Sequence, residues 1–120
     1  MIRLAFLLIW MAGVAVAQDF NARATVIDAQ AKRDVLTLTL SQPIPWRVFV
    51  EDDPWRLVID TSEVDWTTLN ADLLTNLGQA RSGRIRAGWS RLVILLPGPR
   101  RIDRAWMQTG QDATIRIALA

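Results

Sequence analysis

The sequence has no histidine, no cysteine and no tyrosine among its 120 residues, and its single lysine is Lys32. Without histidine or cysteine, a zinc site built on those ligands, a Cys–His pair and a Ser–His–Asp triad are all excluded. No disulfide can stabilise the fold, so an apolar core must do so unaided. These absences favour a binding protein over an enzyme.

The first seventeen residues are typical of a secretory signal peptide. Arg3 makes the start positive, an uncharged apolar run covers residues 4–14, and Ala15-Val16-Ala17 has the form of a cleavage site. The alternative is an N-terminal membrane anchor, although the apolar run is short for a bilayer span. We therefore predict export, a mature chain of residues 18–120, and no membrane attachment after cleavage.

The mature chain has little net charge. Thirteen basic residues stand against twelve acidic ones, and twelve of the basic residues are arginine. The sequence pI of about 10.4 overstates the basicity, because no side chain titrates between the carboxylates and the arginines and lysine. The pI therefore gives no reason to expect a nucleic-acid partner.

The mature chain favours short strands throughout. Seven or eight strands, one short helix and no alternation of strand and helix predict a single all-β domain over residues 18–120. The expected architecture is an antiparallel β-sandwich, with a partly open barrel as the alternative. The expected strands cover residues 22–28, 35–40, 46–50, 55–59, 83–87, 91–96, 101–108 and 113–118.

The strongest local signal is a β-hairpin over residues 45–60. Two runs of β-favouring residues flank Glu51-Asp52-Asp53-Pro54, and acids followed by proline are typical of turns. The strings at residues 55–59 and 90–94 are nearly the same and lie 35 residues apart. This similarity is either chance or the trace of a duplicated hairpin.

The helical candidate covers residues 67–77. Its leucines fall on one apolar stripe, Gly78 is suited to end it, and Asp65 or Thr67 could cap its start. The leucines of the stripe are Leu69, Leu73, Leu74 and Leu77.

The acidic residues around the hairpin suggest two further kinds of site. A carboxylate-pair hydrolase is one, and a calcium site at the turn is the other. The acids of the turn are consecutive, whereas calcium loops of the EF-hand type space their ligands at alternate positions. We interpret these acids as turn and strand-end residues: Glu51, Asp52, Asp53, Asp60, Glu63 and Asp65.

Tryptophan and arginine provide the candidate ligand surface. Tryptophan faces stack on sugar rings and arginine binds carboxylates with two parallel hydrogen bonds, which suits an acidic glycan or glycopeptide. The alternative is that most of the five tryptophans of the mature chain are core residues, with Trp46 the foremost core candidate. The predicted ligand-binding residues are Trp55, Arg56, Arg86, Trp89 and Arg91.

The hairpin over residues 47–60 resembles the signature hairpin of the AMIN domain: an aromatic strand, an acid–proline turn, then Arg-Leu-Val-x-Asp. Residues 85–96 resemble the second hairpin of that family, and residues 104–107 with the terminal strand resemble the C-terminal segment of its proteobacterial members. The resemblance implies a periplasmic β-sandwich of two similar small sheets. It transfers no ligand residues, so the candidate surface rests on the residues alone.

The resemblance also implies a function. AMIN domains usually precede a zinc-dependent N-acetylmuramoyl-L-alanine amidase or occur in pilus secretins, where they bind peptidoglycan and localise their partner domain, typically at the division site. We therefore expect a non-catalytic peptidoglycan-binding domain without a cofactor, with envelope or division proteins as further partners. The alternatives are an amidase fragment that lacks its catalytic domain and a protein-docking module of an envelope complex.

Overall fold

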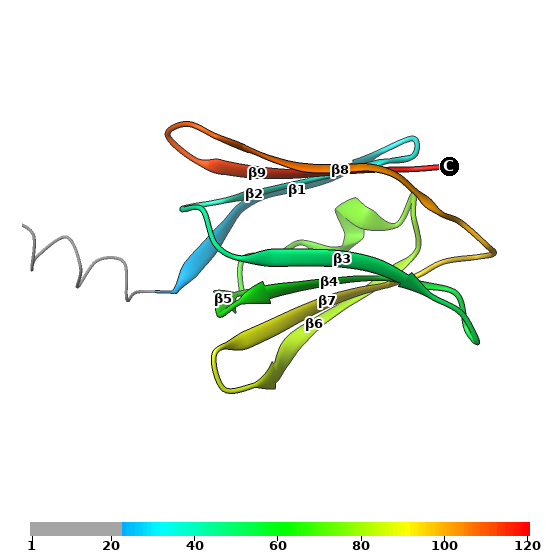
Figure 1. The fold of residues 1–120 in the computed structure, drawn as a ribbon, viewed down its shortest axis with the longest axis horizontal. Coiled ribbons are helices and arrows are strands. Elements are labelled where there is room, and N and C mark those ends of the chain that lie inside the picture. The colour runs from blue at the N-terminus through cyan, green and yellow to red at the C-terminus, as the bar shows by residue number, and fades with distance from the viewer. Residues whose placement is uncertain (1–22) are drawn as a thin grey trace, which may run out of the picture.

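The computed structural model describes residues 23–120 of the chain (Figure 1). The expected signal peptide, residues 1–17, and residues 18–22 of the expected mature domain lie outside the described residues. Within residues 23–120, no helix is both long and apolar enough to cross a membrane.

The described chain consists mainly of β-strands, which form two sheets that face each other (Figure 1). The five-stranded sheet has the order β5-β1-β2-β9-β8, and the four-stranded sheet has the order β3-β4-β7-β6. All neighbouring pairs are antiparallel except β1 and β5. The prediction of a small all-β sandwich is confirmed. The strands are β1 (Ala24–Lys32), β2 (Val35–Leu40), β3 (Trp46–Glu51), β4 (Arg56–Ser62), β5 (Val64–Asp65), β6 (Gln79–Arg86), β7 (Trp89–Leu95), β8 (Ile102–Thr109) and β9 (Ala113–Leu119).

The core lies between the sheets and is built from alternate residues of the central strands. In β2, Leu36, Leu38 and Leu40 are fully buried, as their period of two predicts. Taking one such side chain out of water contributes about 1.5–3 kcal/mol, so this core can replace the disulfides that the sequence lacks. Other fully buried core residues are Leu57, Ile59, Leu92, Ile94, Ile115 and Ile117.

The predicted hairpin is present as β3 and β4, joined by residues 52–55. Glu51 lies directly opposite Arg56, so the loop lies one residue further along the chain than predicted: β3 ends one residue later and β4 begins one residue later. Asp53 has a φ of 60°, in the left-handed region that aspartate tolerates better than most residues. The acidic turn is therefore a four-residue hairpin loop.

Of the two similar strings, residues 56–59 of the first lie in β4 and residues 90–94 lie in β7, and these strands pair with each other at the centre of the four-stranded sheet. Val58 lies opposite Val93, Arg56 opposite Leu95, and Asp60 opposite Arg91. A shift of 35 residues exchanges the partners in this register, so an approximate twofold axis at the valine pair relates β4 to β7 and brings β3 to the position of β6 in the sheet. The shift itself does not extend to these outer strands: Glu51 lies opposite Arg56, whereas the residue opposite Arg91 is Gly83 and not Arg86. This arrangement supports the duplicated-hairpin interpretation.

The helix predicted at residues 67–77 is wrong except for a short segment. The structure has a 3-10 helix over Ala71–Leu74, capped by Asn70, whose side chain accepts a hydrogen bond from the Asp72 amide at 3.1 Å. Thr75 Oγ1 donates to the carbonyl of Asp72 at 2.9 Å. Such side-chain bonds to the local backbone compete with a continuous helix.

The leucine stripe of the expected helix is accordingly broken. Leu74 and Leu77 are fully buried and Leu69 packs against the core, whereas Leu73 is 48 % exposed. Asp65 caps no helix; its Oδ1 accepts hydrogen bonds from the amide and hydroxyl of Thr67. The short helix contacts β1 and β6 and lies between the two sheets in Figure 1.

Two strands extend four residues beyond a predicted bound. β1 continues to Lys32, which pairs with Val35 across a two-residue turn in which Arg33 has a φ of 55°. β6 begins at Gln79, four residues before the predicted start, because it pairs with β7 along nearly its whole length. Pairing with a neighbouring strand thus extends segments in which the alternation of apolar and polar residues is weak.

The fold leaves no room for a side chain at Gly78. A Cβ at this position would overlap the backbone carbonyl of Leu95, whereas a Cβ at Gly110 would meet nothing within 4 Å. We expect Gly78→Ala to lower the free energy of unfolding by roughly 3 kcal/mol, as measured by urea denaturation. Gly110→Ala is the control and should change it by less than about 0.5 kcal/mol. Equal effects of the two substitutions would contradict this account.

Candidate functional site

The outer face of the four-stranded sheet carries most of the candidate residues. Alternate residues of β4 and β7 point into the core, so the residues between them point away from it. The register adds residues of β3 and β6 to the same surface. This surface, called the outer face below, consists of Arg47, Phe49, Glu51, Arg56, Val58, Asp60, Ser62, Gln79, Arg81, Gly83, Arg86, Trp89, Arg91, Val93 and Leu95.

A buried carboxylate organises the centre of the outer face. Asp60 of β4 lies opposite Arg47 of β3 and opposite Arg91 of β7, so the three residues form one row across three strands. Arg91 donates from Nε to Oδ1 at 2.6 Å and from Nη2 to Oδ2 at 3.0 Å. Arg47 donates from Nε to Oδ2 at 2.9 Å. Asp60 is fully buried beneath these contacts.

The two arginines also lie near an aromatic ring. The guanidinium carbon of Arg47 is 5.5 Å from the centroid of the Phe49 ring, and that of Arg91 is 5.9 Å from it. Both distances fall in the range of cation–π contacts. The ring and the carboxylate together hold the two guanidinium groups in place, while 63 % of the Arg47 side chain and 33 % of the Arg91 side chain stay exposed.

The ion pairs keep Asp60 charged. The hydrogen bonds from Arg91 are the largest cause and those from Arg47 add to them, and together they hold the pKa of Asp60 below its usual value, against the opposing effect of burial. The same contact raises the pKa of Arg91. At neutral pH, the row of Arg47, Asp60 and Arg91 therefore carries two positive charges and one negative charge.

A second cation–aromatic contact lies at one end of the outer face. Trp89 begins β7 opposite Ser62, and Arg86 of β6 lies opposite Trp89 across a bulge. The guanidinium carbon of Arg86 is 5.9 Å from the indole centroid. Trp89 is half-buried and is not among the side chains that pack against the core. The indole is therefore an aromatic group of the outer face, with Arg86 over its ring.

Four of the five predicted ligand-binding residues lie on the outer face: Arg56, Arg86, Trp89 and Arg91. Trp55 does not, because its side chain packs against the core and its carbonyl accepts a hydrogen bond from the Leu96 amide at 2.9 Å. The 35-residue shift explains this difference. It relates Trp55 to Ser90, and both positions point inward, whereas Trp89 is one residue earlier and points outward.

The two Trp–Arg pairs among the predicted ligand-binding residues, Trp55 with Arg56 and Trp89 with Arg91, do not form one groove. β4 and β7 are antiparallel, so the start of one strand lies beside the end of the other. Arg56 is the first residue of β4, and Ser62, which lies opposite Trp89, is the last. At the usual rise of a strand these two residues are about 20 Å apart. Arg56 moreover binds the Glu51 carboxylate and the carbonyl of Pro54.

Sequence reasoning missed several residues of the outer face. Arg47 and Phe49 alternate with the core residues of β3, and this period of two was a signal that could have placed them on one surface. Asp60 is an acid at the end of an apolar run. An acidic side chain is buried in a strand only when it has a partner of opposite charge. The partner, Arg91, is 31 residues away and has no local signal.

The outer face carries an excess of positive charge. It holds five arginines, at positions 47, 56, 81, 86 and 91, and two carboxylates, on Glu51 and Asp60, a balance of +3. Both carboxylates already bind arginine. The described part of the chain has no group of three or more acidic side chains positioned to hold a metal ion, the acidic turn included.

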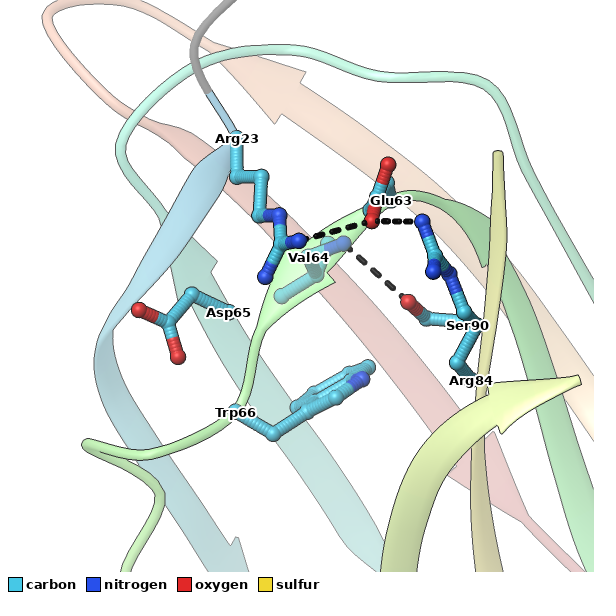
Figure 2. A pocket seen from close by; sticks show the side chains of 7 residues that line it. All are labelled: Arg23, Glu63, Val64, Asp65, Trp66, Arg84 and Ser90. Carbon is cyan, nitrogen blue, oxygen red and sulfur yellow. Dashed lines mark hydrogen bonds and ion pairs between the residues drawn. The ribbon is translucent and has the colours of Figure 1, made fainter. Parts of the chain in front are cut away.

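A smaller polar pocket of about 210 Å³ lies at the start of β5 (Figure 2). Figure 2 shows Arg23 and Arg84 reaching Glu63 from opposite sides, at 3.1 Å and 2.6 Å. With Asp65, the charged groups of the pocket balance. The indole hydrogen of Trp66 is buried and has no partner within residues 23–120. The excess charge of the outer face makes it the better candidate for an acidic ligand.

No family model matches this chain, and no curated protein matches it either. The resemblance to the AMIN domain therefore remains a prediction.

Replacing Asp60 tests the central row. Because the folded pKa of Asp60 is lowered, its carboxylate stabilises the fold above the ordinary aspartate pKa of about 4, and this contribution is lost as the pH falls through the folded pKa. We expect Asp60→Asn to lower the free energy of unfolding by roughly 3 kcal/mol at pH 7, and by less in acid, as measured by urea denaturation from pH 7 to pH 2.

The control is Asp34→Asn, which removes a carboxylate that binds Arg100 at 2.7 Å but is 63 % exposed. Its cost should stay below about 1 kcal/mol, because solvent screens an exposed pair. A pH-independent gap between wild type and Asp60→Asn would contradict the role given to the ionised carboxylate.

Proposed function

We propose that this protein is a non-catalytic, exported module that binds the peptidoglycan of the cell wall through the outer face. The single observation that carries the proposal is the excess of arginine on a sheet surface that also presents the face of Trp89. Guanidinium groups bind carboxylates with paired hydrogen bonds, and indole rings stack on sugars. A polymer that contains both sugars and acidic peptides matches this pair of chemistries.

The geometry favours an extended ligand. The outer face spans four strands, whose neighbours lie about 4.8 Å apart, and its arginines are distributed over all four. A polymer that crosses such a surface can meet several guanidinium groups in turn. The carboxylates of the outer face each bind arginine and are not set up as a free acid and base, which supports a binding role.

The resemblance to the AMIN domain supports the same proposal and adds a cellular role. In this role, the module resides in the periplasm and holds a partner at the cell wall, such as an N-acetylmuramoyl-L-alanine amidase at the division site. The zinc chemistry of that amidase would belong to the partner domain, whether the partner is a separate protein or part of a longer chain.

The edge of the four-stranded sheet supports a second candidate function, docking to an envelope protein. β6 is an edge strand with most of its side chains exposed, among them Ile85 at 41 %. An edge of this kind can accept a strand from a partner. Three arginines and a bulge between Arg84 and Arg86 oppose such pairing, which is why we rank docking second.

Sedimentation with purified sacculi that have been stripped of protein tests the proposal. We expect the wild type to sediment with them, and the double variant Arg86→Ala/Trp89→Ala to bind roughly tenfold more weakly, because it loses a cation and a stacking face. The measurement is the dissociation constant from sedimentation at several sacculus concentrations.

The chain offers a matched control on the opposite surface. Arg104 and Trp106 of β8 form a similar contact, 4.5 Å from guanidinium carbon to ring centroid, on the outer side of the five-stranded sheet. The double variant Arg104→Ala/Trp106→Ala should bind as the wild type does. Equal weakening by both double variants would remove the assignment to the outer face, and failure of the wild type to sediment would remove the proposed function.

A further inference from the structure

The two related hairpins of the four-stranded sheet differ at one informative position. In the first hairpin, Glu51 lies opposite Arg56 and its carboxylate binds the guanidinium. In the second hairpin, Arg91 takes the place of Arg56, and the residue opposite it on β6 is Gly83. The second hairpin therefore has the arginine of the pair but no carboxylate on its own neighbouring strand, and Arg91 instead binds Asp60 of β4.

The space at Gly83 is open. A Cβ built at this residue would meet no atom within 4 Å, and its φ is not positive, so nothing in the backbone requires glycine there. Gly83 follows the regular register of β6 with β7. The missing side chain thus leaves an accessible position on the outer face rather than a gap in the core.

Cations surround this position. Arg91 lies directly across from Gly83, Arg81 is two residues away on the same side of β6, and Arg86 follows after the bulge. Arg91 uses Nε and Nη2 for Asp60, so Nη1 takes no part in those bonds. Within residues 23–120, neither Arg81 nor Arg86 forms an ion pair. Arginines without a carboxylate partner, held on a sheet around an open position, make a binding site for an anion.

An apolar hollow adjoins the position. It has a volume of about 280 Å³ and is lined by Gln79, Arg81, Val93 and Leu95. Leu95 is 43 % exposed, which is unusual for a leucine in a central strand. The hollow can bury a small aliphatic group next to the anion, whereas a sugar ring would find no aromatic face there to stack on.

We infer that the Gly83 position binds a free carboxylate of the peptide part of peptidoglycan, and that the hollow beside it takes a small aliphatic side chain of the same peptide. The carboxylate occupies the place that the Glu51 carboxylate has in the first hairpin. This inference rests on the proposed function and deepens it: it assigns recognition to the peptide, whose carboxylates are charged, and not to the N-acetylated sugar backbone, which offers neutral hydroxyl and amide groups.

The sharpest test is to fill the proposed site with a side chain of the protein itself. Gly83→Glu would supply the carboxylate that the first hairpin already has, and the open space at Gly83 can hold the side chain. Gly83→Gln has the same shape without the charge. The probe is the soluble disaccharide tetrapeptide released from sacculi by a muramidase, and the matched probe is the same molecule with its carboxylates converted to carboxamides.

We expect the wild type to bind the disaccharide tetrapeptide at least about tenfold more tightly than its carboxamide form, since charge-assisted hydrogen bonds are lost in the latter. Gly83→Glu should lose affinity for the peptide by at least a similar factor, because its side chain both fills the position and neutralises the arginines, whereas Gly83→Gln, which fills the position without the charge, should lose less. Urea denaturation of both variants shows that the fold is kept.

The outcomes separate the two proposals. Equal affinity for the two forms of the probe, or no loss of affinity in Gly83→Glu, overturns the carboxylate site. Glycan strands from which an amidase has removed the peptides keep the lactyl carboxylates that this hydrolysis frees, so those carboxylates are first converted to carboxamides. Undiminished binding to the resulting neutral strands also overturns the site, while the proposed function stands. Failure of the wild type to bind intact sacculi overturns the proposed function itself.

Discussion

The antiparallel pairing of β4 with β7 is the constraint on which both the core and the candidate site depend. On the inner side, it brings Leu57 and Ile59 beside Ile94 and Leu92, four of the fully buried side chains of the core. On the outer side, the same register brings Asp60 beside Arg91. Because side chains alternate across a strand, a slip of one residue would put the charges into the core and the leucines into solvent.

The buried Asp60 is better explained by the orientation of arginines than by stability. Removing a carboxylate from water is costly, and well-packed apolar residues often replace buried ion pairs without loss of stability. An apolar residue at this position would keep the sheet but leave Arg47 and Arg91 without a common anchor. With Asp60 in place, the two guanidinium groups are held on either side of one carboxylate, which suits a surface that must present cations in a defined arrangement.

Local patterns in the sequence predicted the hairpin at residues 45–60, the buried leucines of β2 and the core position of Trp46, all of which the structure has. The same reasoning failed for the helix, because Asn70 and Thr75 satisfy the local backbone through their side chains. It also placed Trp55 on the ligand surface together with Trp89. The two residues are one position out of step in the repeat, and they point to opposite sides of the sheet.

The class of fold could be predicted from the sequence, because strand periodicity and turn residues depend on neighbours along the chain. The tertiary structure alone decided that β4 lies beside β7, that the arginines of four strands share one face, and that Gly83 lies opposite Arg91. These pairings join residues far apart in the chain. They are selected by how the two sheets bury their apolar sides against each other, which no local pattern specifies.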